Sequence, residues 1–226
     1  MTLSRFFIVG LLLVSAARGA VGQTAAPAHP TAHQWESEIR AFEEADRRAP
    51  PPRGAVLFVG SSSIRLWKTL AEDFPTTKVI NRGFGGSHLA DAVYYADRIV
   101  IPYRPRLILL YAGSNDLAAG KSPERVFEDY REFVEKVRRQ LPPTRIAYIS
   151  IAPNPARWHL VSQMRAVNDL IRTYTARDRR LIYIDVFAAM LGPDGKPRPE
   201  LFIEDKLHMN ATGYRLWRSI IAPYLR

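Results

Sequence analysis

Ala55-Val56-Leu57-Phe58-Val59-Gly60-Ser61-Ser62-Ser63 is a short apolar run that ends in one glycine and three serines. A run of this length, rich in branched and aromatic residues, predicts a strand that is buried on both faces. Gly60 lets the chain bend at the end of the strand, and the residues that follow have a helical pattern. The stretch is therefore typical of the first strand-to-helix unit in a parallel α/β sheet.

Four more short apolar runs follow, and longer amphipathic stretches separate them. The five predicted strands are residues 55–59, 78–80, 107–112, 146–151 and 181–186. The predicted helices are residues 64–70, 89–100, 123–140, 157–176 and 211–221, with Asn210 as the N-cap of the last. Because each parallel connection needs a crossover, this alternation predicts a three-layer α/β/α fold, with a five-stranded parallel sheet between two layers of helices.

The composition limits the class of protein. The chain has 226 residues, of which 47% are hydrophobic and 24% charged, and it has no cysteine. Such a chain buries a core, and it has no thiol for catalysis, disulfides or thiolate metal sites. We expect one domain over residues 51–226, preceded by a linker and an N-terminal helix over residues 23–50. Trp35, Ile39 and Phe42 recur at helical spacing in that helix, which we expect to pack on the domain.

The N-terminus has the pattern of a secretory signal peptide over residues 1–22. Arg5 is followed by an apolar run over residues 6–14, and Ala20 and Gly22 stand at the minus-three and minus-one positions of a cleavage site. The run is shorter than the about 20 residues that a membrane-spanning helix needs. We expect an exported protein, periplasmic or extracellular, with no stable membrane anchor.

The chain is basic, with a formal net charge of +10. Its lysines and arginines are scattered through the predicted helices and form no basic strip interleaved with aromatic residues. This pattern indicates a solvated basic face, and we expect no nucleic-acid partner.

Candidate functional residues follow the predicted strands, at the sheet edge where parallel α/β sheets bind ligands. Acyl transfer by a serine needs a hydroxyl, a base, a group that orients the base, and donors for the oxyanion. Ser62 follows the first strand, and His208 has a carboxylate, Asp205, three residues before it. Gly86 and Asn115, after the second and third strands, are candidate oxyanion donors. Together these residues point to hydrolysis by a serine nucleophile.

Each of these residues also has a purely structural interpretation, as a helix cap, a turn residue or part of a surface loop. A phosphate-binding or flavin-binding module would explain residues 60–63 but not Asp205 and His208. A Gly-x-Ser-x-Gly elbow would need glycine where the chain has Ile64, which argues against an α/β-hydrolase fold.

Four blocks resemble those of the GDSL or SGNH hydrolases, in particular the branch of the platelet-activating-factor acetylhydrolase catalytic subunits and their bacterial relatives. They are residues 56–67, Asn-Arg-Gly-Phe-Gly-Gly at 81–86, Gly-Ser-Asn-Asp at 113–116 and Asp-Lys-Leu-His at 205–208. The resemblance implies a flavodoxin-like sheet, no cofactor or metal, and ester hydrolysis through an acyl-enzyme. It would make Ser62 the nucleophile, His208 the base and Asp205 its orienting acid. The oxyanion hole would consist of the Ser62 and Gly86 backbone and the Asn115 side chain.

The chain departs from the family's Gly-Asp-Ser-Leu block, because Ser61 replaces the aspartate and Ser63 the leucine. The departure concerns the positioning of the loop and which serine is the nucleophile. Trp158 and His159 follow the fourth strand, and we expect them to wall the substrate pocket.

The predicted function is esterase action on small-molecule or glycan esters. We expect a preference for short acyl groups, acetyl foremost, because the loop before His208 is polar. The alternatives are a carbohydrate O-deacetylase of the same fold and a non-catalytic envelope-binding relative.

Overall fold

The computed structural model describes residues 34–225, so the predicted signal peptide and residues 23–33 lie outside the described residues. Its sheet has five strands in the order β2-β1-β3-β4-β5, and every neighbouring pair is parallel. The strands are β1 (Val56–Gly60), β2 (Val79–Gly83), β3 (Leu107–Tyr111), β4 (Arg145–Ile149) and β5 (Leu181–Ile184). The predicted five-stranded parallel sheet is confirmed. This strand order is the flavodoxin-like one. The chain adds β2 on one side of β1 and then crosses to add β3 on the other side, so the order in which strands are added reverses between β1 and β3.

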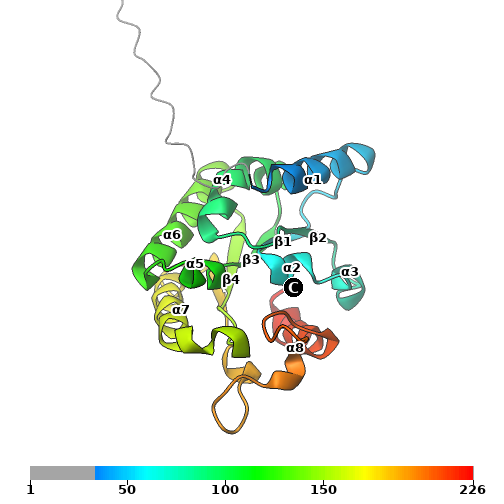
Figure 1. Ribbon diagram of the computed structural model, residues 1–226. Coiled ribbons are helices and arrows are strands. Elements are labelled where there is room, and N and C mark those ends of the chain that lie inside the picture. Colours follow the sequence, from blue (N-terminus) through cyan, green and yellow to red (C-terminus); the bar gives the residue numbers. More distant parts are fainter. Residues whose placement is uncertain (1–33, 226) are drawn as a thin grey trace, which may run out of the picture.

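Helices cover both faces of the sheet, as the alternation of strands and helices predicts (Figure 1). The helices on one face are α1 (Glu36–Arg48), α4 (Leu89–Ile99), α6 (Pro123–Gln140) and α7 (Val161–Thr175). Those on the other face are α2 (Ser62–Arg65), α3 (Leu70–Asp73) and α8 (Ala211–Ile221). The short helices are α5 (Ser114–Ala118), η1 (Ile101–Tyr103), η2 (Pro155–Leu160), η3 (Ala188–Met190), η4 (Pro199–Leu201) and η5 (Ala222–Leu225).

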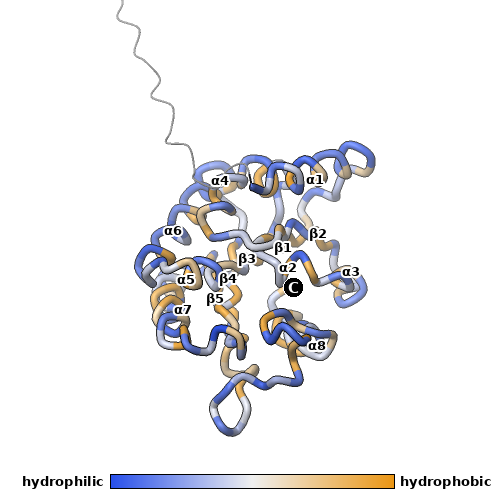
Figure 2. Tube along the Cα trace, viewed as in Figure 1, coloured by the Kyte–Doolittle hydropathy of each residue, from blue (hydrophilic) through white to orange (hydrophobic). Residues whose placement is uncertain are grey.

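Two hydrophobic cores lie between these layers. Side chains of β1 alternate between them, because Leu57 and Val59 join one core while Val56 and Phe58 join the other. Hydrophobic residues gather along the strands and on the helix sides that face them (Figure 2). A strand that is buried on both faces explains why its sequence is a continuous apolar run.

The predicted helix over residues 64–70 is wrong in its extent, because the chain leaves the helix after Arg65 and resumes in α3 at Leu70. The break carries Trp67 into the core, where it packs against Phe58 and Trp217. Its Nε1 donates a hydrogen bond to Asp73 Oδ2 at 2.7 Å. Burial of the largest side chain in the segment thus overrides the local helical pattern.

The edge strand β2 extends three residues beyond its prediction, to Gly83. The prediction ends before the polar pair Asn81-Arg82, which does not match an apolar strand pattern. In the structure Arg82 is buried and forms an ion pair with Asp46 of α1. Its Nε also donates to Tyr103 Oη at 2.7 Å. A charged residue occupies a strand here because its partners come from distant parts of the chain.

Helix α1 packs on α4, as the spacing of its apolar residues predicts. Trp35 and Ile39 are buried in the core, and Trp35 Nε1 donates to Gly85 O at 2.6 Å. Arg98 of α4 binds Glu36 at 2.7 Å and Glu43 at 2.6 Å. The helix thus contacts the loop that follows β2, which is one of the loops of the candidate site.

Candidate active site

The turn from β1 into α2 places Ser62 at the carboxyl edge of the sheet, beside the point where strand order reverses. Gly60 has a φ of +138°, and a Cβ at this position would lie 1.9 Å from Tyr111 O. Only glycine fits such a close approach. The Ser61 N–H then donates to Tyr111 O at 2.9 Å, which ties the turn to β3. Ser62 begins α2 immediately after this contact.

Ser62, His208 and Asp205 form a continuous hydrogen-bonded chain. The distance from His208 Nε2 to Ser62 Oγ is 2.9 Å, and His208 Nδ1 lies 2.6 Å from Asp205 Oδ2. When Nδ1–H donates to the carboxylate, Nε2 is free to accept the Ser62 hydroxyl proton. The structure therefore brings together the serine, histidine and aspartate that the sequence singles out, from positions 146 residues apart.

The loop that carries Asp205 and His208 is tightly bonded. Asp205 Oδ1 accepts hydrogen bonds from the N–H groups of Leu207 and His208, each at 2.9 Å. Burial raises the pKa of Asp205, but hydrogen bonds from the backbone and ring of His208 and from Leu207 outweigh it, so the pKa lies below its ordinary value. The carboxylate is thus ionised at neutral pH and can stabilise a charged imidazole.

Asn210 caps α8 directly after this loop, as predicted. Its Oδ1 accepts hydrogen bonds from Thr212 N at 2.8 Å and Gly213 N at 3.2 Å. The cap fixes where the helix starts, and with it the position of His208 two residues earlier.

The Asn115 side chain connects three segments of the site. Its Nδ2 donates to Ser87 O at 3.1 Å, and its Oδ1 accepts a hydrogen bond from Arg157 Nη1 at 2.9 Å. These contacts fix the orientation of the amide, and its second N–H makes no further hydrogen bond within residues 34–225. Gly86 precedes Ser87 with a φ of +78°, and no heavy atom lies within 4 Å of where its Cβ would stand. The candidate donors Gly86 and Asn115 thus come from adjacent loops.

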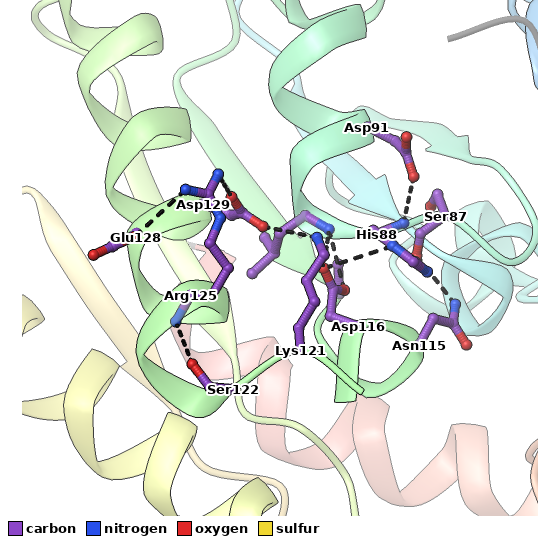
Figure 3. Close-up of polar contacts among 12 residues, drawn as sticks. Ser87, His88, Asp91, Asn115, Asp116, Lys121, Ser122, Arg125, Glu128 and Asp129 are labelled. Carbon is purple, nitrogen blue, oxygen red and sulfur yellow. Dashed lines mark hydrogen bonds and ion pairs between the residues drawn. The ribbon is translucent and has the colours of Figure 1, made fainter. Parts of the chain in front are cut away.

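A buried ionic cluster fixes these loops relative to each other (Figure 3). Asp116 is fully buried and accepts hydrogen bonds from Leu89 N, at the start of α4, and from Lys121 Nζ at 2.8 Å. Lys121 also binds the buried Asp129 of α6 at 2.9 Å. Burial lowers the pKa of Lys121, but the two carboxylates outweigh it and the pKa is raised. Asp116 therefore braces the loop beside Asn115 against two helices.

A small cleft of about 20 Å³ lies beside Ser62. Its lining residues are Ser61, Ser62, Ser63, Tyr111, Ser114, Asn115, Ala152, Asn154, Arg157, Met190, Phe202, Leu207, His208, Met209 and Trp217. Trp158 and His159 are not among them, so the structure does not bring these two residues to the cleft beside Ser62. Trp158 packs against the core between the sheet and α7, and His159 is exposed.

The residue that reaches the cleft is Arg157, which sequence reasoning missed. The predicted helix over residues 157–176 starts instead as the tight turn η2, and α7 begins at Val161. Asn154 caps η2 through a hydrogen bond from Arg157 N at 2.9 Å. Neighbouring side chains in such a turn point about a third of a revolution apart, so Arg157 faces the cleft while Trp158 faces the core. The Asn-Pro pair at 154–155 signals the turn but not its direction.

Comparisons with known proteins identify the family. The model of the GDSL-like lipase/acylhydrolase family matches residues 58–216, more than half of the chain. The chain belongs to this family and is a hydrolytic esterase. None of the curated proteins matches the chain.

Solved structures share the fold at low sequence identity. A Streptococcus pneumonia protein, assigned provisionally as a platelet activating factor, is 20% identical with a TM-score of 0.75, over 85% of this chain and 94% of that one. A GDSL-like lipase from Bacteroides thetaiotaomicron is 19% identical with a TM-score of 0.71, over 84% and 97%. A carbohydrate esterase family 3 protein from Talaromyces cellulolyticus is 16% identical with a TM-score of 0.61, over 75% and 95%. The architecture is thus the SGNH hydrolase fold.

The described part of the chain, residues 34–225, contains no group of three or more histidine, aspartate or glutamate residues that could hold a metal ion. None of its helices has both the length and the apolar character needed to cross a membrane.

Proposed function

We propose that the protein hydrolyses carboxylic esters through a covalent acyl-enzyme on Ser62. The observation that carries this proposal is the chain of contacts from Ser62 Oγ to His208 Nε2 at 2.9 Å and from His208 Nδ1 to Asp205 at 2.6 Å. A base within 3.2 Å of a serine hydroxyl, itself oriented by a carboxylate, is the arrangement that activates serine as a nucleophile. The same contacts argue against a non-catalytic, envelope-binding role.

In the first half of the reaction, Ser62 Oγ attacks the ester carbonyl carbon and its proton passes to His208 Nε2. The N–H groups of Ser62 and Gly86 and the Asn115 amide stabilise the oxyanion of the tetrahedral intermediate. The bond to the alcohol oxygen breaks, and His208 returns the proton to that oxygen. In the second half, water repeats the attack, which releases the acid and restores Ser62. Asp205 stabilises the imidazolium in both halves.

The test is a comparison of three adjacent serines. We expect Ser62→Ala to abolish both ester hydrolysis and labelling by a fluorophosphonate, because Ser62 is the one of the three serines with a described hydrogen bond to His208. Ser61→Ala and Ser63→Ala serve as matched controls and should keep most of both. Mass spectrometry of labelled peptides locates the adduct. An adduct on Ser61 or Ser63 would show that the nucleophile is not Ser62.

We propose short acyl groups, acetyl foremost, as the preferred acids. Two features support this: the cleft is only about 20 Å³, and seven of its lining residues are serine, asparagine or arginine. A volume of roughly 10–15 Å³ is needed for a single water molecule, so the cleft holds a small group. A longer chain gains about 0.8 kcal/mol per CH₂ only where an apolar wall receives it.

An O-acetylated carbohydrate is the second candidate substrate. The polar residues in the cleft favour it, and one similar fold is that of an acetyl xylan esterase. Acetate release from acetylated xylan and from a simple aryl acetate distinguishes the two. A carbohydrate deacetylase would show the higher kcat/KM on the glycan, whereas a general short-chain esterase would show it on the aryl ester.

We propose export for the whole protein, supported by the pattern of Arg5, the apolar run over residues 6–14 and the small residues Ala20 and Gly22. Expression in a bacterial host, followed by fractionation and intact-mass measurement, tests it. Cleavage after Gly22 should give an exported protein that begins at Gln23. An uncleaved chain in the cytosolic fraction would contradict export.

A further inference from the structure

We propose that the cleft selects acetyl esters whose alcohol part carries a carboxylate, and that Arg157 binds this carboxylate. The proposal rests on ester hydrolysis at Ser62 and adds the substrate class. Its basis is the environment of one guanidinium, which lies in the cleft and has no ion pair with any carboxylate of the described part of the chain.

The position of Arg157 is fixed at both ends of the residue. Its backbone N–H donates to Asn154 Oδ1 at 2.9 Å. Its Nη1 donates to Ser114 Oγ and to Asn115 Oδ1, each at 2.9 Å. The guanidinium is therefore held against the candidate oxyanion donor, within reach of a substrate that is bound at Ser62.

The charge of Arg157 has no counter-ion among the described residues. Its two side-chain hydrogen bonds there go to neutral oxygens, and no carboxylate of residues 34–225 forms an ion pair with it. By contrast, Arg82, Arg98 and Arg125 each bind a carboxylate. Burial lowers the pKa of Arg157 and the nearby Tyr111 offsets only part of this, which indicates that the charged form is partly desolvated. A partly buried charge is costly unless it finds a partner.

The lining of the cleft leaves the substrate as that partner. Arg157 is the only lysine or arginine among the lining residues, and none of them is an aspartate or glutamate. The N–H groups of Nε and Nη2 make none of the described hydrogen bonds, so the guanidinium keeps donors for a ligand. An arginine presents these donors as a planar fork that matches a carboxylate. One cation balances one negative charge, which favours a carboxylate over a phosphate monoester with its charge of about −1.5 to −2.

The proposed acyl group, acetyl, places the carboxylate on the alcohol part of the ester. Acetyl carries no charge, so the charge that Arg157 binds belongs to the alcohol. In this proposal the alcohol presents its carboxylate to the outer donors of Arg157.

A second role of Arg157, orientation of the Asn115 amide, would affect all esters alike. The test therefore compares two esters of the same shape, 4-acetoxybenzoate and 4-acetoxybenzamide, and repeats the comparison with the 3-acetoxy isomers. The quantity measured is the ratio of kcat/KM for the acid to kcat/KM for the amide. The orienting role and the intrinsic reactivities cancel when this ratio is compared between wild type and variants.

For the wild type we expect a ratio of about 10 or more in at least one isomer pair. The reason is that a hydrogen bond between charged groups is stronger than one between neutral groups. Arg157→Gln should lower the ratio about tenfold. Arg157→Lys keeps the charge but loses the planar pair of donors, so its ratio should lie between those of the wild type and Arg157→Gln. Arg165→Gln is the matched control: this exposed arginine stacks on Phe187 outside the cleft lining, and the ratio should not change.

Equal use of acid and amide by the wild type in both isomer pairs would overturn the proposal, whatever the variants do. The proposal would also be overturned if Arg157→Gln kept the wild-type ratio, or if Arg165→Gln lowered the ratio as much as Arg157→Gln. In either case the preference for the acid would come from the net positive charge of the protein and not from Arg157. Hydrolysis of neutral aryl acetates with no preference for the acid refutes this inference alone. Failure to hydrolyse any ester refutes the proposed function, and the inference with it.

Discussion

The three consecutive serines at residues 61–63 have different environments, although the sequence alone does not distinguish them. Ser61 is buried, and its carbonyl accepts hydrogen bonds from Ile64 N and Arg65 N in the first turn of α2. The Ser63 carbonyl accepts from Tyr214 Oη at 2.9 Å. Of the three serines, Ser62 is the one whose side chain has a described hydrogen bond to His208. The replacement of the family's aspartate by Ser61 thus leaves the contact between Ser62 and His208 intact.

Asn115 is the residue whose removal best tests the oxyanion hole. We expect Asn115→Ala to lower kcat by about 10²–10³ with a smaller change in KM, because an oxyanion donor acts mainly in the transition state. The variant should fold, since the buried bonds of Asp116 hold the same loop. Steady-state kinetics and a thermal melt measure both effects.

Asn115→Asp is the matched control for shape, because it replaces the N–H donor with an oxygen of similar size. It should lose as much kcat as Asn115→Ala. If either variant folds and keeps wild-type kcat, Asn115 has no role in the oxyanion hole.

At the scale of elements, charged contacts between helices join α1 to the domain. Glu36 stands in the first turn of α1 and Arg98 in the last turn of α4, so each charge also suits its helix dipole. A hydrogen bond from Arg98, and a second from Arg40, lower the pKa of Glu36 from 4.5 to about 2. The ionised form of Glu36 is therefore favoured by folding.

This pKa shift predicts a stability difference that depends on pH. Because the pKa of Glu36 is lower in the folded state, its contribution is present above pH 4.5 and is lost as the pH falls toward about 2. We expect Glu36→Gln to lower Tm at pH 7, and the difference from wild type to shrink through that window. Thermal melts followed by circular dichroism, at several pH values, measure it.

Glu44→Gln provides the control on the same helix. Glu44 is exposed and has none of the described ion pairs, so its substitution should leave Tm nearly unchanged at every pH. A Glu36→Gln difference that stays constant from pH 7 to pH 2 would show that the carboxylate does not act through its charge.

At the scale of the whole molecule, the cleft is assembled from loops that follow β1, β3 and β4 and from the loop before α8. The β2-β1-β3-β4-β5 order makes β1 and β3 neighbours, so their carboxyl ends open the crevice where Ser62 and Asn115 lie. These loops are short after β1 and β3, where helices α2 and α5 begin almost at once. The shape of the cleft is therefore set by how the elements meet rather than by a long covering segment.

This shape predicts the dependence of rate on acyl chain length. Along a series of p-nitrophenyl esters from acetate to laurate, we expect kcat/KM to fall beyond butyrate, since the cleft of about 20 Å³ has no room for a chain. The leaving group is constant in the series and serves as its own control. A steady rise of kcat/KM with chain length would show that an apolar wall receives the chain, and would contradict the proposed preference for short acyl groups.

Local patterns were sufficient to predict much of the fold and of the site. Helix α6 begins at Pro123 and ends at Gln140 as predicted, because its capping and its apolar spacing are written in adjacent residues. The family blocks likewise identify Ser62, Asp205 and His208, which the structure brings into contact. The pocket residues were missed, because η2 turns Arg157 toward the cleft and Trp158 toward the core.

The sequence by itself determined the five parallel strands, the helices between them and the residue types that stand at the strand ends. These follow from periodicity, capping and crossover rules, which depend on residues close together in the chain. Only the tertiary structure decided that α2 ends early and Trp67 is buried, and that Arg82 lies in an edge strand beside Asp46. It also decided that Arg157 lies at Asn115 without a counter-ion among residues 34–225. Each of these depends on partners tens of residues away, since burial and charge pairing are set by which elements pack together.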